Sequence, residues 1–309
     1  MSSSHKNWVL GFLAKELSNN LECFRPRIIA FPQSRRNTRS LKGFLLFPKS
    51  EVNIFLHHEL ALTAISKGWL DKRSINLIIM THLTSEDPRL SVLKNHFQLV
   101  IVNNSQTKEY LCGIGFEADL IHVFQNPIDE KFRSFQKREQ RIRDVIFVSN
   151  YTPRKRPDLI AKVVQGSPEI DFTLFGRGWA GQAELAQIID LPNFVFSDFD
   201  FATYPQTLGE HKVFCSLSDI EGGPVPLLEA LVMGLNVVAT DTGSARDLII
   251  GTDNSRIIPI NPDIDVIKES LNLSLEGFPN SFIVKDSYFY AGFAQQIQEL
   301  ILGCWQRVP

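Results

Sequence analysis

Along this chain, apolar residues at helical spacing alternate with short, nearly continuous apolar runs. In residues 8–21 they fall on one helical face, which carries Trp8, Phe12, Leu13, Leu17 and Leu21. Short runs rich in apolar residues follow, and they predict buried strands. In the first half of the chain the predicted strands are residues 27–31, 52–56, 76–80, 99–103 and 120–124, and the predicted helices are residues 60–67 and 106–112.

The second half repeats the alternation more regularly. Predicted strands are residues 145–149, 172–175, 194–196, 213–216 and 236–239, and a helix is predicted within residues 284–305. The charged run at residues 134–144 predicts a linker between two domains. Alternating strands and helices indicate an α/β protein with parallel sheets. The predicted divisions are residues 1–137, 138–284 and a C-terminal segment 285–309.

Composition narrows the class of protein. The length of 309 residues suits two domains, and an apolar fraction of 44% is typical of a globular chain. The four cysteines are widely scattered, which predicts neither a disulfide framework nor a zinc site and favours a cytoplasmic location. The first residues carry no signal peptide pattern, and no apolar run is long enough to predict a membrane span.

Positive charge is concentrated near the N-terminus. The segment from Arg25 to Lys49 contains seven Arg and Lys residues and no acidic residue, although the net charge of the whole chain is −2. Such a segment predicts peripheral contact with anionic lipid or with an acidic acceptor, and a solvated basic loop is the alternative. Aromatic residues are too sparse within it to favour a nucleic acid.

The most informative stretch of the sequence is residues 216–248. A predicted strand leads to Glu221, then to Gly222, Gly223 and Pro224, and then to an apolar helix that carries Glu229 and is predicted to end at Gly234. The start of a helix directs its N–H groups and its positive dipole end at an anion, and glycine allows close approach. The two carboxylates offer acceptors to hydroxyl groups. A nucleotide sugar combines a phosphate with sugar hydroxyls, and this is the ligand that the stretch predicts.

Glu229 lies among aliphatic residues, where a carboxylate is costly unless it is hydrogen-bonded. Two ligand hydroxyls would satisfy it. The alternative interpretation is a glutamate on the exposed edge of an ordinary strand–helix unit.

The spacing of Glu221 and Glu229 within EGGPVPLLEA, followed by VVATDTG, resembles the donor site of the retaining family-four glycosyltransferases. The resemblance implies the GT-B fold, with two Rossmann-like αβα domains facing a central cleft and a last helix crossing back to the first domain. It implies that Glu221 lies by the transferred sugar, that Glu229 holds the ribose, and that the Gly222-Gly223-Pro224 turn cradles the diphosphate. Because the chain enters its first helix almost at once, a shortened N-terminal domain is expected.

The resemblance assigns further residues to the donor. It implies a lysine on the diphosphate at Lys155, while Asn150 stands at the family's arginine position, so that Arg154 or Arg156 is expected to supply the missing charge. Gly176 and Arg177 match a glycine loop beside the nucleotide. His82 matches a histidine over the donor sugar, so the expected catalytic residues are Glu221, His82 and Lys155.

The predicted function is therefore sugar transfer, with retention, from a UDP- or GDP-linked donor to an acceptor hydroxyl, in envelope polysaccharide or glycolipid synthesis. No cofactor and no essential metal are expected, and the Asp198-Phe199-Asp200 match to a metal-binding pattern is interpreted as two surface acids. The alternatives are a non-catalytic GT-B protein that binds a nucleotide or glycan, and another GT-B enzyme such as a sugar-nucleotide epimerase.

Overall fold

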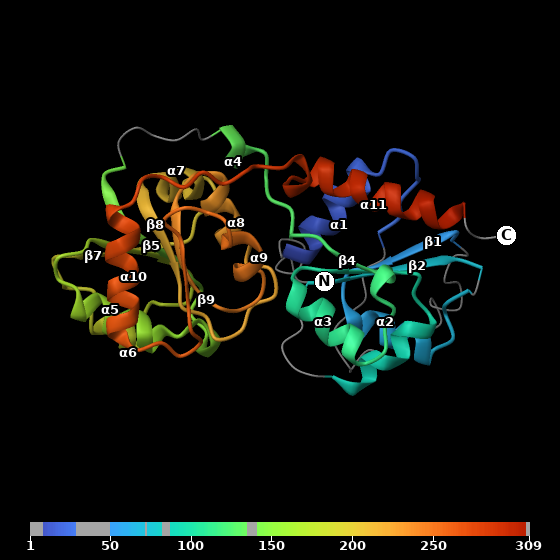
Figure 1. Cartoon of the computed structure of the whole chain (residues 1–309), viewed down its shortest axis with the longest axis horizontal. Helices are drawn as coiled ribbons and strands as arrows, with labels where there is room; N and C mark the ends of the chain where they lie inside the picture. The colour runs from blue at the N-terminus through green and yellow to red at the C-terminus, as the bar shows by residue number, and fades with distance from the viewer. Residues whose placement is uncertain (1–8, 29–49, 72, 82–86, 135–140, 307–309) are drawn as a thin grey trace. The chain divides into compact units, whose positions relative to one another are not determined.

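The computed structural model describes residues 9–28, 50–71, 73–81, 87–134 and 141–306, and it divides into two compact units (Figure 1). The first unit comprises Met1–Pro127 and Lys285–Pro309, and the second comprises Ile128–Val284. The boundary lies ten residues before the predicted one at 137/138. It does so because α4 (Lys131–Ser134) packs on α8 (Val225–Val232), and the ring of Phe132 lies 5.7 Å from that of Tyr204.

The first unit is built on a parallel sheet in the order β1-β2-β3-β4. Its C-terminal helix packs along its N-terminal helix, where the rings of Phe12 and Tyr290 lie 5.2 Å apart (Figure 1). The elements of the unit are α1 (Val9–Asn20), β1 (Val52–Phe55), α2 (His58–Ser66), β2 (Ile75–Met80), η2 (Pro88–Asn95), β3 (Leu99–Val102), α3 (Ser105–Gly113), η3 (Ala118–Leu120), β4 (Ile121–Val123), η5 (Asp286–Tyr288) and α11 (Tyr290–Trp305).

Alternate side chains of the first sheet enter two separate cores. In β2, Leu77 and Ile79 pack with α1 and α11, whereas Ile78 and Met80 pack with α2 and α3. A strand turns successive side chains to opposite faces, so a strand that is buried throughout has helices on both sides. The continuous apolar run of β2 thus produces a three-layer αβα unit.

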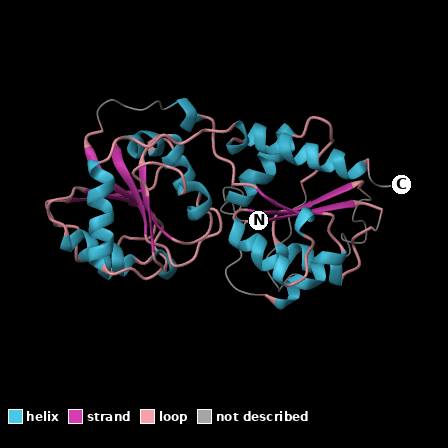
Figure 2. Cartoon of the chain, in the orientation of Figure 1, coloured by secondary structure: helices cyan, strands magenta, loops and turns pink. Residues whose placement is uncertain are grey.

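The second unit carries a six-stranded parallel sheet in the order β10-β9-β8-β5-β6-β7. Helices lie beside the strands of this unit (Figure 2). Its remaining elements are β5 (Arg143–Val148), η4 (Pro153–Lys155), α5 (Pro157–Gly166), β6 (Phe172–Gly176), α6 (Ala183–Ala186), β7 (Phe194–Asp198), α7 (Tyr204–Gly209), β8 (His211–Ser216), β9 (Asn236–Thr240), α9 (Ala245–Ile249), β10 (Arg256–Ile258) and α10 (Ile264–Glu276).

This strand order has a functional consequence. The chain builds β5, β6 and β7 outward in one direction, then returns to the other side of β5 to place β8, β9 and β10. The order is that of a doubly wound dinucleotide-binding sheet, in which ligands bind at the carboxyl ends of the strands where the winding reverses. In this unit the reversal lies between β5 and β8.

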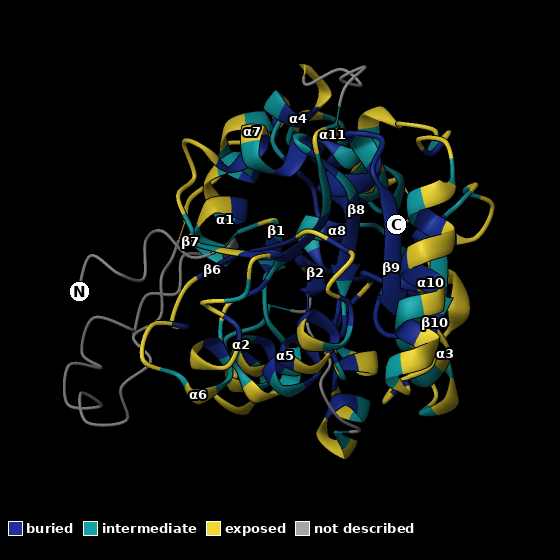
Figure 3. Cartoon of the chain, turned by 90° about the vertical axis from the view of Figure 1, so that its left-hand side faces the viewer, coloured by how far each residue is buried: buried dark blue, intermediate teal, exposed yellow. Residues whose placement is uncertain are grey.

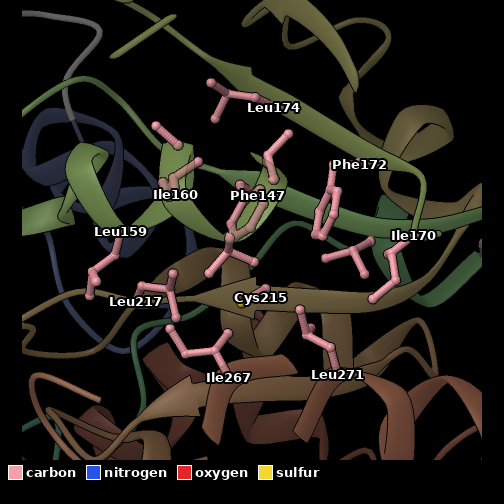
Figure 4. Close-up of a cluster of buried hydrophobic side chains, with 14 of the residues drawn as sticks. Phe147, Leu159, Ile160, Ile170, Phe172, Leu174, Cys215, Leu217, Ile267 and Leu271 are labelled. Atoms are coloured by element: carbon pink, nitrogen blue, oxygen red, sulfur yellow. The ribbon is translucent and has the colours of Figure 1, made fainter. Parts of the chain in front are cut away.

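The central strands of the second unit are buried, and α10 alternates exposed and buried positions along its length (Figure 3). Phe147 of β5 and Phe172 of β6 stack in the core on one face of the sheet, together with Ile267 and Leu271 of α10 (Figure 4). The predicted α/β class with parallel sheets is confirmed. The short strand β10 and the helices α5 and α10 had not been assigned from the sequence.

Candidate functional site

The two loops at the winding reversal carry most of the charged residues that were predicted from the sequence to form the donor site. The loop after β5 contains Asn150, Arg154, Lys155 and Arg156, and the turn after β8 contains Glu221. The loops are in direct contact, since the Asp219 N–H donates to the Arg154 carbonyl at 2.8 Å. Residues 65 positions apart therefore meet in one site at the carboxyl edge of the sheet.

Glu221 is a buried acid held by two cations. Its side chain is only 5% exposed; Lys155 Nζ donates to Oε1, and Arg154 Nη1 lies 3.0 Å from the same oxygen. Burial raises the pKa of Glu221, but the charges of Lys155 and Arg154 and the Lys155 hydrogen bond outweigh it and hold the pKa below its usual value. Glu221 is therefore ionised, and the surplus positive charge of this group lies beside it.

The turn that carries Glu221 is fixed by the loop after β9. The Glu221 N–H donates to Thr242 Oγ1 at 3.0 Å, and Thr240 Oγ1 donates to the Ser218 carbonyl at 2.5 Å. Gly243 has a φ of +58°, and a Cβ there would lie 2.4 Å from the Gly222 carbonyl oxygen. Only glycine permits this backbone approach, so the site depends on the ATDTG sequence as well as on the glutamates.

Helix α8 positions the second glutamate as the sequence predicted. Pro224 precedes its first turn, and Gly234 ends it with a φ of +80° while the Leu235 N–H donates to the Ala230 carbonyl. Glu229 is 6% exposed, so the alternative of an exposed edge position is wrong. Its carboxylate also has a hydrogen-bond partner within the protein, because Tyr204 Oη donates to Glu229 Oε2 at 2.6 Å.

The environment of Glu229 differs from that of Glu221. Burial raises the pKa of Glu229 to about 7, while the Tyr204 hydrogen bond and the charge of Lys131 act in the opposite direction. Tyr204 is the residue that the sequence analysis missed. It lies 25 positions before Glu229, and no pattern in the sequence pairs the two, since the contact depends on how α7 packs beside α8.

Gly176 and Arg177 meet Asn150 across the ends of β5 and β6. The Arg177 N–H donates to Asn150 Oδ1 at 3.1 Å, and Trp179 Nε1 donates to the Ser149 carbonyl at 2.6 Å. A Cβ on Gly176 would lie 1.8 Å from that carbonyl oxygen. Asn150 therefore links two loops, and no cation occupies its position.

The Arg177 guanidinium lies over two aromatic rings that are accessible to solvent. Its Cζ is 5.3 Å from the ring centre of Phe199 and 5.6 Å from that of Phe201, which is 59% exposed. The Phe199 ring lies 5.0 Å from that of Tyr204, so this aromatic surface is continuous with the residue that holds Glu229.

Other predicted residues are placed differently. Arg156 bonds to Asp158 at 2.9 Å and Asp219 at 3.1 Å, so its guanidinium is held by acids, and Arg154 is the arginine that accompanies Lys155. His82 and residues 29–49 of the basic segment lie outside the described part of the chain. Asp198 and Asp200 are exposed, as expected for surface acids.

The first unit contains a polar cluster at the carboxyl ends of its strands. His58, Glu59 and Asp87 lie close enough together to hold a metal ion. However, Arg89 Nη2 lies 2.5 Å from Glu59 and 2.7 Å from Asp87, so one guanidinium bonds to both carboxylates. A mostly apolar cavity of about 1370 Å³ lies in this unit and is lined by residues of α1, β1 and α11 and by Arg25 and Arg27. Of the part of the chain that the structure describes, no helix is both long and apolar enough to cross a bilayer.

Comparison with known proteins places the second unit in a family. Residues 128–280 match the model described as glycosyl transferases group 1. The chain is also 28% identical over 152 residues to the O-antigen biosynthesis glycosyltransferase WbnH of Escherichia coli. That match covers 48% of this chain and 43% of WbnH, so it spans less than half of the relative.

Solved structures extend the similarity in fold to both units. The lipopolysaccharide outer core galactosyltransferase WaaB superposes with a TM-score of 0.63 at 16% identity, over 96% of this chain and 82% of WaaB. Anabaena Alr3699/HepE in complex with UDP-glucose gives 0.59 at 15% identity, over 84% and 79% of the two chains. Residues 128–280 thus match the group 1 glycosyl transferases, and the fold of the chain is that of the GT-B glycosyltransferases, which confirms the resemblance at the level of glycosyltransferase type and fold.

Proposed function

We propose that this protein is a retaining glycosyltransferase that moves a sugar from a nucleotide-diphosphate donor to an acceptor hydroxyl. The observation that carries the proposal is the convergence of Lys155 and Arg154 on Glu221 at the winding reversal of the second sheet. Two cations and one carboxylate leave a net positive charge at an edge where doubly wound sheets bind phosphates.

Lys155 and Arg154 would bind the diphosphate. As the bond to the sugar breaks, the leaving diphosphate gains negative charge, and cations already in position stabilise it without reorganising. Glu221 is ionised and holds both side chains before the donor binds, and its carboxylate would then face the transferred sugar. The departing phosphate oxygen would take the proton of the acceptor hydroxyl on the same face, so the protein would act by positioning and by stabilising charge.

The nucleoside would extend toward Glu229. The ionised Glu229 carboxylate accepts hydrogen bonds from ribose hydroxyls, and the Phe199 and Phe201 rings under Arg177 offer a flat surface to a base. Tyr204 touches both Glu229 and the Phe199 ring, so the ribose and base positions are adjacent. The proposed donor therefore follows the edge of the second sheet from Glu221 to Arg177.

The acceptor would be a glycan or glycolipid of the cell envelope. Support comes from WbnH, an O-antigen biosynthesis glycosyltransferase, and from WaaB, an outer core galactosyltransferase. Contact with anionic lipid through Arg25–Lys49 is part of the proposal, because the segment carries seven basic residues and no acidic one. A cytoplasmic location is also part of the proposal, because the widely scattered cysteines favour a reducing compartment. The proposed reaction needs no metal, and its rate is expected to persist in EDTA.

A screen of nucleotides tests the proposal. UDP, GDP, ADP and their hexose conjugates are added separately, and thermal unfolding is followed; a ligand at 100 times its Kd stabilises the protein by about 2.7 kcal/mol. One nucleotide and its sugar conjugate are expected to raise the Tm, and the conjugate should lose its sugar to an added glycan or to water. Binding without any turnover would favour a non-catalytic protein, isomerised donor without an acceptor would favour an epimerase, and no shift with any nucleotide would overturn the proposal.

A further inference from the structure

Tyr204 is held in one orientation by aromatic rings from three other elements. Its ring stacks on Phe175 of β6 at 5.7 Å and 12°, meets Phe132 of α4 edge-on, and lies beside Phe199. The residue is only 3% exposed. Burial holds the pKa of the Tyr204 hydroxyl well above its ordinary value, so the hydroxyl remains a hydrogen-bond donor throughout the neutral range.

The partner of this hydroxyl is a carboxylate that forms no ion pair with any cation among the described residues. Tyr204 Oη donates to Glu229 Oε2 at 2.6 Å, and α8 contains no charged residue besides Glu229. The charged groups that act on Glu229 are Lys131 and Asp129, whose side chains lie 3.9 Å from each other. Of the titratable residues of β8, His211 bonds to Thr173, Lys212 bonds to Asp144, and Cys215 lies in the hydrophobic core.

We propose that Tyr204 is a positioning residue for the donor, whose hydroxyl fixes the Glu229 carboxylate in one orientation and stabilises its ionised form for binding the ribose. The inference rests on the proposed function in one respect, namely that Glu229 binds the ribose. An ionised carboxylate can accept about four hydrogen bonds, so the Tyr204 bond leaves Oε1 and part of Oε2 to the two hydroxyls of a ribose.

The charge state of Glu229 makes this role measurable. A protonated carboxyl has fewer acceptor sites and no charge, so the ionised form accepts from the two ribose hydroxyls more strongly. The pKa of Glu229 is about 7, the net result of burial, which raises it, and of the Tyr204 hydrogen bond and the charge of Lys131, which lower it. Without that hydroxyl the pKa rises, and a larger fraction of the protein is protonated at neutral pH.

The test is Tyr204→Phe, which keeps the ring stacked on Phe175 and removes only the hydroxyl. The probe is whichever of UDP, GDP and ADP binds the wild-type protein most tightly, and its Kd is measured by calorimetry from pH 5.5 to 8.5. Tyr204→Phe is expected to weaken binding about 10-fold at pH 7, since the lost bond is to a charged acceptor, and to move the pH of half-maximal affinity up by about one unit.

Two further variants make the result decisive. Tyr110→Phe removes a hydroxyl from a partly buried tyrosine of α3 in the first unit and should leave both the affinity and its pH profile unchanged. Glu229→Gln cannot ionise, so it should flatten the pH profile, and adding Tyr204→Phe to it should change the profile no further. Thermal unfolding of each variant checks that it is folded.

The outcomes separate the inference from the proposed function. If none of the three nucleotides binds the wild-type protein, the proposed function fails and the inference falls with it. If a nucleotide binds and Tyr204→Phe matches the wild type within about twofold at every pH, or weakens binding equally at every pH, the positioning role is overturned while the proposed function stands.

Discussion

Glu221 and Glu229 stand eight positions apart on one turn and helix, and their surroundings differ in almost every respect. Glu221 is buried against Lys155 and Arg154, and its pKa is lowered. Glu229 is buried among aliphatic and aromatic side chains with one hydroxyl partner, and its pKa is raised to about 7. The spacing in the sequence therefore fixes where two carboxylates lie, but loops and helices from elsewhere decide which of them is charged.

The difference matches two chemical tasks. A carboxylate that is always ionised keeps two cations in place for a diphosphate whose charge grows during the reaction. A carboxyl group whose pKa is close to neutral pH changes its charge in that range. Such a group is suited to hold neutral hydroxyls, and its affinity for them depends on pH. Five substitutions distinguish the Glu221 region from the Glu229 region, and they follow from the largest expected effect to the smallest.

Lys155→Met removes a cation from the Glu221 region and keeps most of the side chain's volume. The rate constant kcat of sugar transfer is expected to fall about 10²–10³-fold, the loss typical of removing one preorganised charge-stabilising group. Steady-state kinetics with the donor found by the nucleotide screen measure it. Lys162→Met, on the exposed face of α5, is the matched control. Equal rate constants in the two variants would show that Lys155 takes no part in the transfer step.

Gly243→Ala disturbs the Glu221 region through the backbone. The added Cβ would lie 2.4 Å from the Gly222 carbonyl, at a φ of +58°, so the free energy of unfolding is expected to fall by about 2–4 kcal/mol. Gly251→Ala is the control, because its φ is +86° but no atom lies within 4 Å of the new Cβ, and strain alone should cost about 1–2 kcal/mol. Urea unfolding measures the loss of unfolding free energy in both variants. Equal losses would show that the turn accommodates the added Cβ without further destabilisation.

Glu229→Gln tests the raised pKa through stability. Between about pH 4.5 and 7 the unfolded carboxyl ionises while the folded one keeps its proton, so the wild type loses stability from this group as pH rises. The variant lacks that loss. Its stability relative to the wild type should therefore increase by about 2–3 kcal/mol from pH 4.5 to 7.5, measured by urea unfolding. A difference that does not change with pH would place the pKa of Glu229 at its ordinary value.

Glu221→Gln should give the opposite sign in the same experiment. The folded pKa of Glu221 is lowered, so its contribution is present above about pH 4.5 and disappears as pH falls through the folded pKa. The variant is expected to be less stable than the wild type at pH 7 by about 1–3 kcal/mol, and the deficit should shrink in acid. If the stability of both variants relative to the wild type changed with pH in the same way, Glu221 and Glu229 would not differ in the direction of their pKa shifts.

Phe201→Ala probes the aromatic surface beside the Glu229 region and should have the smallest effect. Phe201 is 59% exposed, so stability should change by less than about 0.5 kcal/mol. Nucleotide affinity is expected to fall about 3–10-fold through lost stacking. Phe278→Ala removes a ring that is 85% exposed elsewhere in the unit and should leave the Kd unchanged. An unchanged Kd in Phe201→Ala would place the base away from Arg177.

The sequence predicts the parts of this fold that depend on local pattern. The buried strands β2 and β3, the turn at Gly222-Gly223 and the end of α8 at Gly234 each follow from a few neighbouring residues. Three-residue β10 is too short to give a periodic signal. Tyr204 and the acids that hold Arg156 could not be predicted, because those contacts depend on how separate helices and loops pack together.

The position of the donor can be observed in a crystal structure of the complex with the nucleotide that raises the Tm most. The diphosphate is expected within hydrogen-bonding distance of Lys155 and Arg154, and the ribose hydroxyls on Glu229. A nucleotide bound elsewhere, with Lys155 and Arg154 contacting only Glu221 and with Glu229 contacting only Tyr204, would contradict this placement of the donor.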